Sequence, residues 1–434
     1  MSTRVLTKVL PRGFRKLSLP ARIAAMVEAG YLSAEQAQLL REGSFTLSGD
    51  HADTMVENAI GSFGLPEGIA VNLLVNQRVY AVPMVVEEPS VIAALSYAAL
   101  LAQRSGGYIA EGAEPLLFGQ VQLLDCRDVD ASLAALVAKT DWLVDCANTL
   151  MPKMQARGGG VKAMDFYVHR TREGAPMLIA QLTVDTRDAM GANAVNTLCE
   201  QLAPTLTNIA GGRASLCILS NLADKAIARA RVCLPAAVLK TAEHSGEQVR
   251  DDIVMANEFA LVDPYRATTH NKGIMNGIDA VAVATGNDWR AVEAAAHAYA
   301  ARSGQYRALT TWTVDAEGNL SGELALPLKV GIVGASLHAN PAVKINLDIL
   351  GVSSATELSA VMAAVGLAQN FSALRALVTS GIQRGHMRLH ARSVAVAAGA
   401  PPELVEKVAE ALMAHGDVKT EAAKTLLDEL HQDD

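Results

Sequence analysis

The chain has 434 residues, a formal net charge of −8, and a composition that is 50% apolar but only 19% charged. A length of this order suggests two to four domains, each able to bury its own core. The acidic balance argues against a nucleic-acid-binding protein, which normally presents a basic face. The excess of apolar over charged residues favours a large subunit interface, so we expect an obligate oligomer.

The cysteines and the N-terminal segment indicate a cytoplasmic protein without a membrane span. Five cysteines are an odd number and contain no C-x-x-C pair, so neither a disulfide framework nor a zinc cluster is expected. Residues 1–20 contain five Arg or Lys but no continuous apolar region of the kind a signal peptide has. The longest apolar stretch, residues 91–102, is too short to cross a bilayer.

The periodicity of the first half predicts helices followed by a small inserted domain. The first hundred residues are predicted to be mostly helical, with an Ala-rich amphipathic helix at 90–103. The next elements alternate in the split βαβ, ferredoxin-like order βαββαβ. They are a strand at 116–124, a helix at 130–147, strands at 164–170 and 176–185, a helix at 188–202 and a strand at 215–219.

The second half is predicted to be helical apart from one β-hairpin and a C-terminal flap. Residues 308–314 and 320–326 alternate around a turn at 317–319. After His390, two short amphipathic helices separated by Gly416 carry too little core to stand alone, so we expect a mobile flap. The fold class is therefore α+β, a large mainly helical domain with a ferredoxin-like insertion and a flap. The boundaries are 1–113 and 225–380 for the large domain, 114–224 for the insertion and 381–434 for the flap.

One glycine-rich segment formally fits a dinucleotide-binding loop but is predicted to be a turn. Residues 158–163 read G-x-G-x-x-A, yet a predicted helix precedes them and a predicted strand follows. The dinucleotide loop requires the reverse order, because the N-terminus of the helix holds the pyrophosphate. A nucleotide bound by this protein would therefore use another fold.

Two other segments suit phosphate better than metal. His386 and His390 lie four residues apart, but Arg384, Arg388 and Arg392 alternate with them and disfavour a cation. Such a group favours a phosphate-bearing anion, or is simply a solvated basic helix face. Residues 188–193 open a predicted helix with small residues, where free N–H groups attract phosphate, although Asp188 could equally be an ordinary helix cap.

Three segments present charged groups beside apolar ones. Glu87 and Glu88 precede Pro89 and an apolar helix, which fits either helix-dipole compensation or a carboxylic acid at an apolar pocket. Residues 269–277 place the single Lys272 in polar, glycine-flanked sequence, and residues 285–290 place Asp288 between apolar stretches. A buried Lys–Asp pair is plausible here, and such a pair favours function over stability.

In their order along the chain, these segments resemble the class II 3-hydroxy-3-methylglutaryl-CoA (HMG-CoA) reductases. The sequence around Lys272, Lys-Gly-Ile-Met-Asn-Gly, is the feature typical of class II, and the resemblance runs from about Arg15 to the C-terminal tail. The segments that carry it are residues 57–61, 87–90, 188–193, 269–277, 285–290 and 385–387.

The resemblance implies a thioester reduction in two hydride transfers, from HMG-CoA to mevalonate with release of CoA. It implies that Glu88 is the general acid and that Lys272 holds the substrate carbonyl and its oxyanion. Asp288 would bridge these two groups, and His386 would protonate the departing CoA thiolate. These residue types suit the chemistry, since each hydride addition places negative charge on oxygen.

The resemblance also implies the binding residues. Ser90, Arg266, Asn276 and Asn370 would contact the HMG part of the substrate, and Arg15 its CoA part. The cofactor side would consist of Asp188, Met190, Gly191, Ala192, Asn193 and Asn221, with no metal.

NADH is the cofactor that the class implies, with NADPH as the alternative. Met151 stands where NADH-using members can carry an acid for the ribose, and Lys153 or Arg157 nearby could hold a 2′-phosphate. The resemblance further implies a homodimer, or a higher oligomer built from it, with active sites at the interface. A CoA-thioester transferase or hydrolase using His386 as a base, without nicotinamide, is the alternative function, and a non-catalytic scaffold is another.

Overall fold

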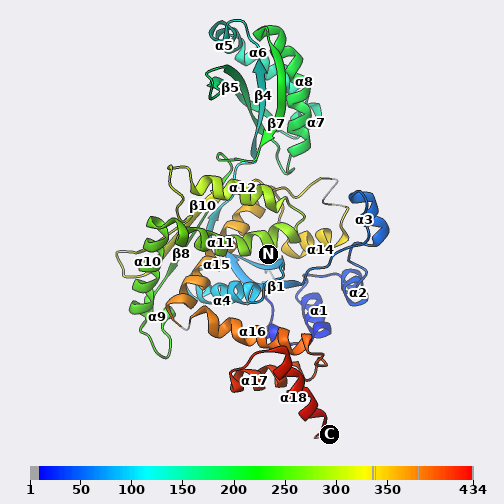
Figure 1. Ribbon diagram of the computed structural model, residues 1–434, viewed down its shortest axis with the longest axis vertical. Helices are drawn as coiled ribbons and strands as arrows, with labels where there is room; N and C mark the ends of the chain where they lie inside the picture. Colours follow the sequence, from blue (N-terminus) through cyan, green and yellow to red (C-terminus); the bar gives the residue numbers. More distant parts are fainter. Residues whose placement is uncertain (1–8, 335–336, 338, 380, 433–434) are drawn as a thin grey trace, which may run out of the picture.

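The computed structural model describes residues 9–334, 337, 339–379 and 381–432, except for the side chains of 382–389 and 431–432. Helices and strands are both abundant, so the predicted α+β class is confirmed. Figure 1 shows a large central body with a smaller unit at one end and the C-terminal helices at the other. Separate apolar clusters fill these parts.

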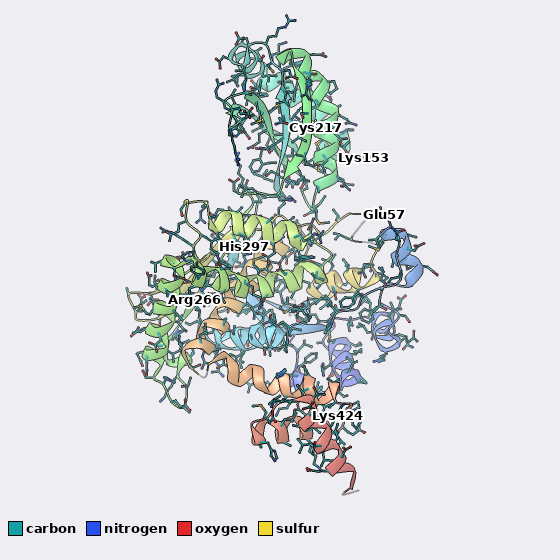
Figure 2. All side chains as sticks on the ribbon, viewed as in Figure 1. Glu57, Lys153, Cys217, Arg266, His297 and Lys424 are labelled. Atoms are coloured by element: carbon teal, nitrogen blue, oxygen red, sulfur yellow. The ribbon has the colours of Figure 1, made fainter. Side chains whose placement is uncertain are left out.

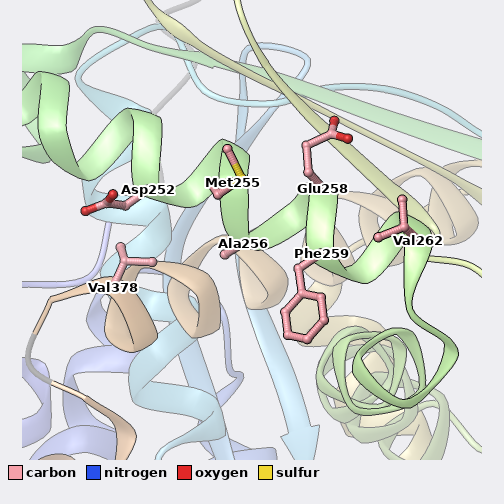
Figure 3. Close-up of a pocket in the computed structure, with 7 residues that line it drawn as sticks. All are labelled: Asp252, Met255, Ala256, Glu258, Phe259, Val262 and Val378. Carbon is pink, nitrogen blue, oxygen red and sulfur yellow. The ribbon is translucent and has the colours of Figure 1, made fainter.

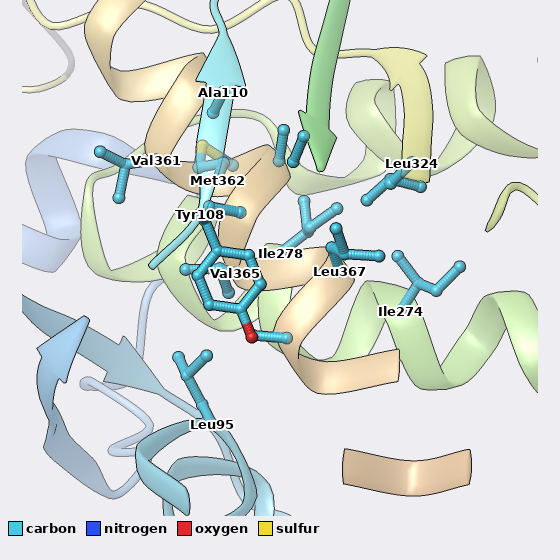
Figure 4. Packing of buried hydrophobic residues seen from close by; sticks show 14 of the residues in the cluster. Leu95, Tyr108, Ala110, Ile274, Ile278, Leu324, Val361, Met362, Val365 and Leu367 are labelled. Carbon is cyan, nitrogen blue, oxygen red and sulfur yellow. The ribbon is translucent and has the colours of Figure 1, made fainter. Parts of the chain in front are cut away.

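Two long helices, α11 (Pro264–Ala284) and α15 (Ala355–Val378), form the centre of the large body. They approach closely because Gly366 has no side chain: a Cβ there would lie 2.7 Å from Ile278 Cδ1. Figure 4 shows Ile274 and Ile278 among the buried side chains of this cluster. Among the described residues, α15 alone is long and apolar enough to cross a membrane, and 72% of its apolar window is buried inside the protein.

A four-stranded antiparallel sheet lies against these helices. Its order is β3 (Ile109–Glu111), β8 (Ile227–Leu234), β10 (Leu320–Pro327) and β9 (Thr310–Val314). The predicted hairpin is confirmed, and the carboxylate of Asp315 accepts the backbone N–H groups of Glu317 and Asn319 in its turn. Helices α9 (Ala236–Leu239), α10 (Gly246–Val262) and α12 (Trp289–Ala300) complete this side.

The prediction of a mostly helical first hundred residues is wrong over residues 67–85. This segment is an antiparallel hairpin of β1 (Glu67–Val75) and β2 (Arg78–Val85). Its alternation is broken by a bulge between Ala70 and Leu73, where Asn72 has a φ of +58°. β2 is buried along most of its length, so neither strand shows the strict alternation that predicts a half-buried strand.

Helices occupy most of the rest of this region. The predicted helix at 90–103 is α4 (Val91–Gln103), with Ser90 as its N-cap residue. The segment before β1 forms the short η1 (Phe14–Lys16), α1 (Leu19–Glu28), α2 (Ala34–Glu42) and α3 (Gly49–Met55).

The strand and helix order predicted for the insertion is confirmed. The sheet order β5–β6–β4–β7, antiparallel throughout, is the ferredoxin-like arrangement. The predicted helix at 130–147 is divided in two, and the turn predicted at 158–160 lies between a helix and a strand. The elements are β4 (Leu116–Leu124), α5 (Val129–Val137), α6 (Thr140–Thr149), α7 (Pro152–Gln155), β5 (Gly160–Arg170), β6 (Pro176–Asp185), α8 (Ala192–Ala210) and β7 (Arg213–Ser220).

The C-terminal part contains three helices that pack on one another. After α14 (Pro341–Leu350) and α15, the chain enters α16 (Ile382–Ala397). The two predicted amphipathic helices are α17 (Val405–His415) and α18 (Thr420–Gln432), and Gly416 ends α17 with a φ of +73°. Their apolar faces and that of α16 form one small cluster.

Candidate active site

The two most suggestive charged groups of the sequence meet in the structure. Lys272, in the middle of α11, donates from Nζ to Oε2 of Glu88 at 2.6 Å. Glu88 lies between β2 and α4, both of which pack against α11. The Lys272 side chain is 59% exposed and that of Glu88 31%, so this pair lies at the surface of a single chain.

The turn that carries Glu88 has an unusual backbone. Ser90 adopts a φ of +79° and makes no side-chain cap to α4. Its hydroxyl is therefore not used in ordinary capping, and the first N–H groups of α4 lack that partner. Glu87 is exposed, whereas Glu88 faces Lys272, which distinguishes the two acids. Helix-dipole compensation, the alternative interpretation of these acids, does not by itself account for the contact between Glu88 and Lys272.

The expectation of a buried Lys272–Asp288 pair is wrong for a single chain. Asp288 is the N-cap of α12, where Oδ1 accepts the N–H of Ala291 at 3.1 Å, and Arg290 lies 3.5 Å away. The Asp288 side chain is 50% exposed. Among the contacts of the described residues, none joins Asp288 to Lys272 or Glu88. Its role as the N-cap of α12 keeps the Asp288 carboxylate at the surface.

A pair of carboxyl groups lies on α11 and α12 near Lys272. Asp279 is hydrogen-bonded to Glu293, and the pKa of Asp279 is raised to about 9 by burial, by that bond and by the Glu293 charge. The pKa of Glu293 is lowered, mainly by its bond to His297 at 2.5 Å, with a further contribution from the Lys272 charge. These shifts favour a protonated Asp279 beside a charged Glu293, and that charge interacts with the Lys272 ammonium.

The contacts of Glu293 and His297 continue through further hydrogen bonds toward α11, the helix that carries Lys272. His297 Nδ1 bonds to the hydroxyl of Tyr306 at 2.6 Å. Asn271, next to Lys272, accepts the N–H of Leu309 and donates to the carbonyl of Arg307. Sequence reasoning missed Asp279 and Glu293. The signal was available, since Asp279 follows Lys272 by seven residues, two helical turns, on the same face.

A second polar cluster surrounds His270, one turn of α11 beyond Arg266. Asn370 is 1% exposed, and its amide oxygen accepts from Trp312 Nε1 at 2.8 Å and from the Thr310 hydroxyl at 3.2 Å. Its Nδ2 lies 3.0 Å from His270 Nε2. Burial, together with the Arg266 charge, lowers the pKa of His270 to about 3. Both the oxygen and the nitrogen of the Asn370 amide are thus hydrogen-bonded inside the protein. This favours a role in supporting Arg266 from beneath over direct contact with a ligand.

The segment predicted for phosphate, residues 188–193, joins β6 to α8. The N-terminus of α8 begins at Gly191 with a φ of +86° and has no side-chain cap. A Cβ at Gly191 would lie 2.4 Å from Thr186 Cγ2, so only glycine fits this turn. Ala192 and Asn193 are exposed, and Met190 is half-buried. The open first turn of a 19-residue helix is a suitable place for a phosphate.

Asp188 has a structural role in the same segment. Its Oδ1 accepts the N–H of Ala355 at 2.8 Å, which caps α15 of the large body. Its backbone carbonyl accepts the N–H groups of Ile332 and Val333. The carboxylate therefore connects residues 188–193 to the start of α15.

The other predicted residues are distributed over both units. Figure 2 places Arg266 on the large body and Lys153 on the small unit. Arg15 is exposed in η1, Asn276 is half-buried one turn beyond Lys272, and Asn221 is exposed after β7. Met151 is buried in the core of the small unit, so it presents no group to a ribose. His386 lies on α16, but its side chain is outside the described residues.

The cysteines and the possible metal-binding residues form no further candidate site within the described residues. All five cysteines are free thiols. No cluster of three or more His, Cys, Asp or Glu suited to a metal occurs within the described part of the chain.

Comparisons with known proteins agree on one family. Residues 19–391 match the family described as hydroxymethylglutaryl-coenzyme A reductase. The 3-hydroxy-3-methylglutaryl-coenzyme A reductase of Archaeoglobus fulgidus is 46% identical over 98% of this chain and 96% of its own length. A probable reductase of the same name from Borreliella burgdorferi is 36% identical, over 80% of this chain and 78% of its own.

Solved structures give the same result. A 3-hydroxy-3-methylglutaryl-coenzyme A reductase from Streptococcus pneumoniae matches with a TM-score of 0.82 at 39% identity, covering 96% of this chain and 99% of that one. The class II enzyme from that organism, bound to NADPH in open conformations, matches with a TM-score of 0.81 at 39% identity, over 96% of this chain and all of that one.

The carboxyl pair generates a prediction about pH. The unfolded Asp279 loses its proton above about pH 4, whereas in the folded protein its pKa is about 9. Between these values the unfolded state binds fewer protons, so the free energy of unfolding falls with pH by up to about 1.4 kcal/mol per unit. Asp279→Asn keeps a donor toward Glu293 and removes this titration. Its unfolding free energy, measured with urea, should therefore rise relative to the wild type between about pH 5 and pH 8.

Asp53→Asn is the control, because that side chain is exposed on α3. It should follow the wild-type pH dependence. A constant difference between Asp279→Asn and the wild type at every pH would contradict a protonated Asp279.

Proposed function

The chain belongs to the hydroxymethylglutaryl-coenzyme A reductase family, and we propose that its Glu88–Lys272 pair is the centre where the thioester is reduced. As a member of this family it is an NAD(P)-dependent oxidoreductase that converts HMG-CoA to mevalonate and releases CoA. The comparisons lend no support to a nicotinamide-independent transferase or hydrolase. The observation that carries the assignment is the 2.6 Å contact between an acid and a lysine at a half-exposed surface.

Lys272 is assigned to the substrate carbonyl. Among the described residues its ammonium has one hydrogen-bond partner, Glu88, so two N–H donors are left for a ligand. When bound, the nicotinamide supplies the hydride that makes the carbonyl oxygen an alkoxide. The fixed ammonium stabilises that developing charge more than it stabilises the ground state, which lowers the barrier.

In its protonated form, Glu88 is assigned as the donor of the proton that the alkoxide takes, and solvent returns a proton to its carboxylate before the next reduction. Its carboxyl lies against the ammonium and therefore beside the oxygen that Lys272 would hold. Asp288 is assigned to the same centre on the resemblance alone. Because the two are not in contact within one chain, its participation depends on the assembly proposed below.

His386 is assigned the proton for the CoA thiolate. An imidazole can donate and recover a proton near neutral pH, and protonating the sulfur prevents its return to the aldehyde. Its helix α16 belongs to the C-terminal part that we propose as a flap.

Most of the residues proposed to bind the substrate are near Glu88 or Lys272 along the chain. Ser90 and Asn276 flank Glu88 and Lys272 on the chain, and Arg266 presents a cation one and a half turns before Lys272 on α11. We assign these to the HMG carboxylate and hydroxyl, with Asn370 supporting Arg266 through His270. Arg15, exposed in η1, is assigned to CoA.

The residues at 188–193 fit a nicotinamide dinucleotide. Gly191 opens the turn and the uncapped N-terminus of α8 offers N–H groups for the pyrophosphate. Met190, Ala192 and Asn193 line the same turn, and Asn221 lies at the end of β7.

We propose NADH as the preferred cofactor. Two cations near this turn, Lys162 and Arg187, lie 3.8 and 3.5 Å from the same carboxylate oxygen of Asp185, which partly offsets their charge. That leaves Lys153 and Arg157, both exposed, as candidates for a 2′-phosphate. Initial rates with NADH and NADPH at equal concentration distinguish the two.

A homodimer would complete the site. Figure 3 shows the exposed side of α10, where Met255, Phe259 and Val262 line a shallow hollow, and Tyr265 follows at 86% exposure. Ile60 and Phe63, beside the 57–61 segment, are almost fully exposed. These two groups of exposed apolar side chains lie apart on the large body, and such exposed groups favour a subunit interface. The half-exposed Lys272 and Asp288 require a cover to exclude water.

The remaining assignments concern organisation and location. We propose that residues 1–113 and 225–380 bind HMG-CoA, that 114–224 bind the cofactor and that 381–434 close over the site. We also propose a cytoplasmic location, which the five free thiols support.

Lys272→Met tests the centre. The variant keeps the apolar stem but removes the ammonium, so kcat should fall by at least about 10³-fold. The readout is NADH oxidation with HMG-CoA, two NADH per CoA released. Lys344→Met, at a lysine that is 69% exposed on α14, is the matched control and should keep wild-type turnover. Retained activity in Lys272→Met would refute the assignment.

His386→Gln separates the two reductions. No thiolate leaves when free mevaldehyde is reduced, so this activity should be largely preserved. Reduction of HMG-CoA should fall by about 10²-fold or more. An equal loss in both reactions would contradict the proposed proton transfer.

Charging the apolar surface tests the assembly. Met255→Glu with Phe259→Glu should shift the mass in sedimentation from dimer to monomer and reduce turnover by about 10²-fold, since an open site admits water. Val137→Glu, on an equally exposed side chain of α5, should do neither. A monomeric wild type would rule out the proposal.

A further inference from the structure

Lys329 is a charged group that neither the sequence analysis nor the proposed mechanism uses. It follows β10, is partly buried, and donates from Nζ to the carbonyl of Ala189 at 2.8 Å and to that of Val330 at 3.3 Å. Burial lowers its pKa to about 8, while the nearby Asp185 and Asp188 oppose that shift. The ammonium of a lysine buried in this way donates to particular carbonyl oxygens rather than to surrounding water.

The oxygen that it holds belongs to the turn assigned to the cofactor. Ala189 lies between Asp188 and Met190, and the same turn is bonded by backbone to residues 332 and 333. The N–H of Ile332 donates to the carbonyl of Asp188 at 2.8 Å, and Ala189 forms an isolated bridge with Val333. The segment after β10 therefore lies along the cofactor turn like a short added strand.

Gly331 allows this close approach. A Cβ at Gly331 would lie 2.4 Å from the N of Met190 and 2.8 Å from the carbonyl carbon of Ala189. These are backbone atoms, which cannot move aside without displacing the turn.

Asn287 ties the same glycine to the other part of the site. Its Oδ1 accepts the N–H of Gly331 at 2.7 Å and its Nδ2 donates to the carbonyl of Gly331 at 3.1 Å. Asn287 is buried and immediately precedes Asp288. Hydrogen bonds thus link Asn287, the neighbour of Asp288, to Gly331. The next residue, Ile332, donates to the carbonyl of Asp188 in the cofactor turn.

We propose that Lys329 is a positioning residue for nicotinamide binding, which sets the cofactor turn at 188–191 against the turn that carries Asp288. This inference rests on the proposed placement of the cofactor at 188–193. Hydride transfer tolerates little displacement of the donor, and an error of about 1 Å costs about 10²-fold in rate. Lys329 donates to the carbonyl oxygen of Ala189 and so fixes the conformation of the turn. The N–H groups at the start of α8 therefore keep one orientation.

Lys329→Met removes the three donors and keeps the stem. The KM for NADH or NADPH, whichever the wild type prefers, should rise about tenfold, and the KM for HMG-CoA should stay within about twofold. Fluorescence titration of the reduced cofactor without HMG-CoA should show the same tenfold loss of affinity. Lys329→Arg, which restores a donor, should recover most of it, and Lys344→Met is the control for removing a surface lysine.

Two results would overturn the inference. One is an unchanged affinity for the cofactor in Lys329→Met; the other is an equal rise of both KM values, which a general structural defect would produce. If Lys329→Met does not fold by circular dichroism, Lys329→Leu, which also removes the donors, is measured against the same two criteria.

Asn193→Ala separates this inference from the cofactor placement itself. Asn193 is exposed on the first turn of α8. If Asn193→Ala and Lys329→Met both leave cofactor affinity unchanged, the placement at 188–193 is wrong. If Asn193→Ala weakens binding and Lys329→Met does not, only the role of Lys329 is refuted.

Discussion

The contact between Glu88 and Lys272 joins the turn between β2 and α4 to the central helix α11. An exposed ion pair contributes about 0–1 kcal/mol to stability, so its presence is not explained by folding. The fold nevertheless supports it from three directions: β2 leads into Glu88, α4 follows it, and α11 carries Lys272. A rigid scaffold that holds two opposite charges at a half-open surface is suited to a ligand whose own charge changes during reaction.

The position of Lys272 along α11 follows from close helix packing. Gly277 lies against Val365 and Gln369 of α15, where a Cβ would be 3.0 to 3.3 Å from their side chains. Gly366 makes the reciprocal approach from α15 to Ile278. Such contacts leave little freedom for a helix to slide or rotate. Asp279 lies on the same helix just beyond them and is hydrogen-bonded to Glu293 of α12. The packing of the core therefore also fixes the Glu293 charge that interacts with the Lys272 ammonium.

Local patterns predicted most of the architecture and part of the site. Strands 116–124 and 176–185 agree with β4 and β6 to the residue, since turn-forming sequence bounds each apolar run. The β1–β2 hairpin was missed because its bulge and its buried second strand remove the alternation. Glu88 and Lys272 are 184 residues apart in the sequence. Their contact results from tertiary packing, which no spacing in the sequence predicts.

Asp188 and Asn370 show where residue type alone misleads. Both are polar residues in segments that the family resemblance assigns to ligands, yet the carboxylate of Asp188 caps α15 and the amide of Asn370 is bonded at both ends in the core. Each holds another part of the site instead: Asp188 fixes the start of the cofactor turn to the central helix, and Asn370 holds His270 beside Arg266. The same logic applies to Lys329 and Asn287. The bond from Lys329 Nζ to the carbonyl of Ala189 joins the large body to the small unit, and Asn287 fixes Gly331 beside the same turn. With the cofactor placed as proposed above, the geometry of hydride transfer depends on side chains that need not touch either substrate.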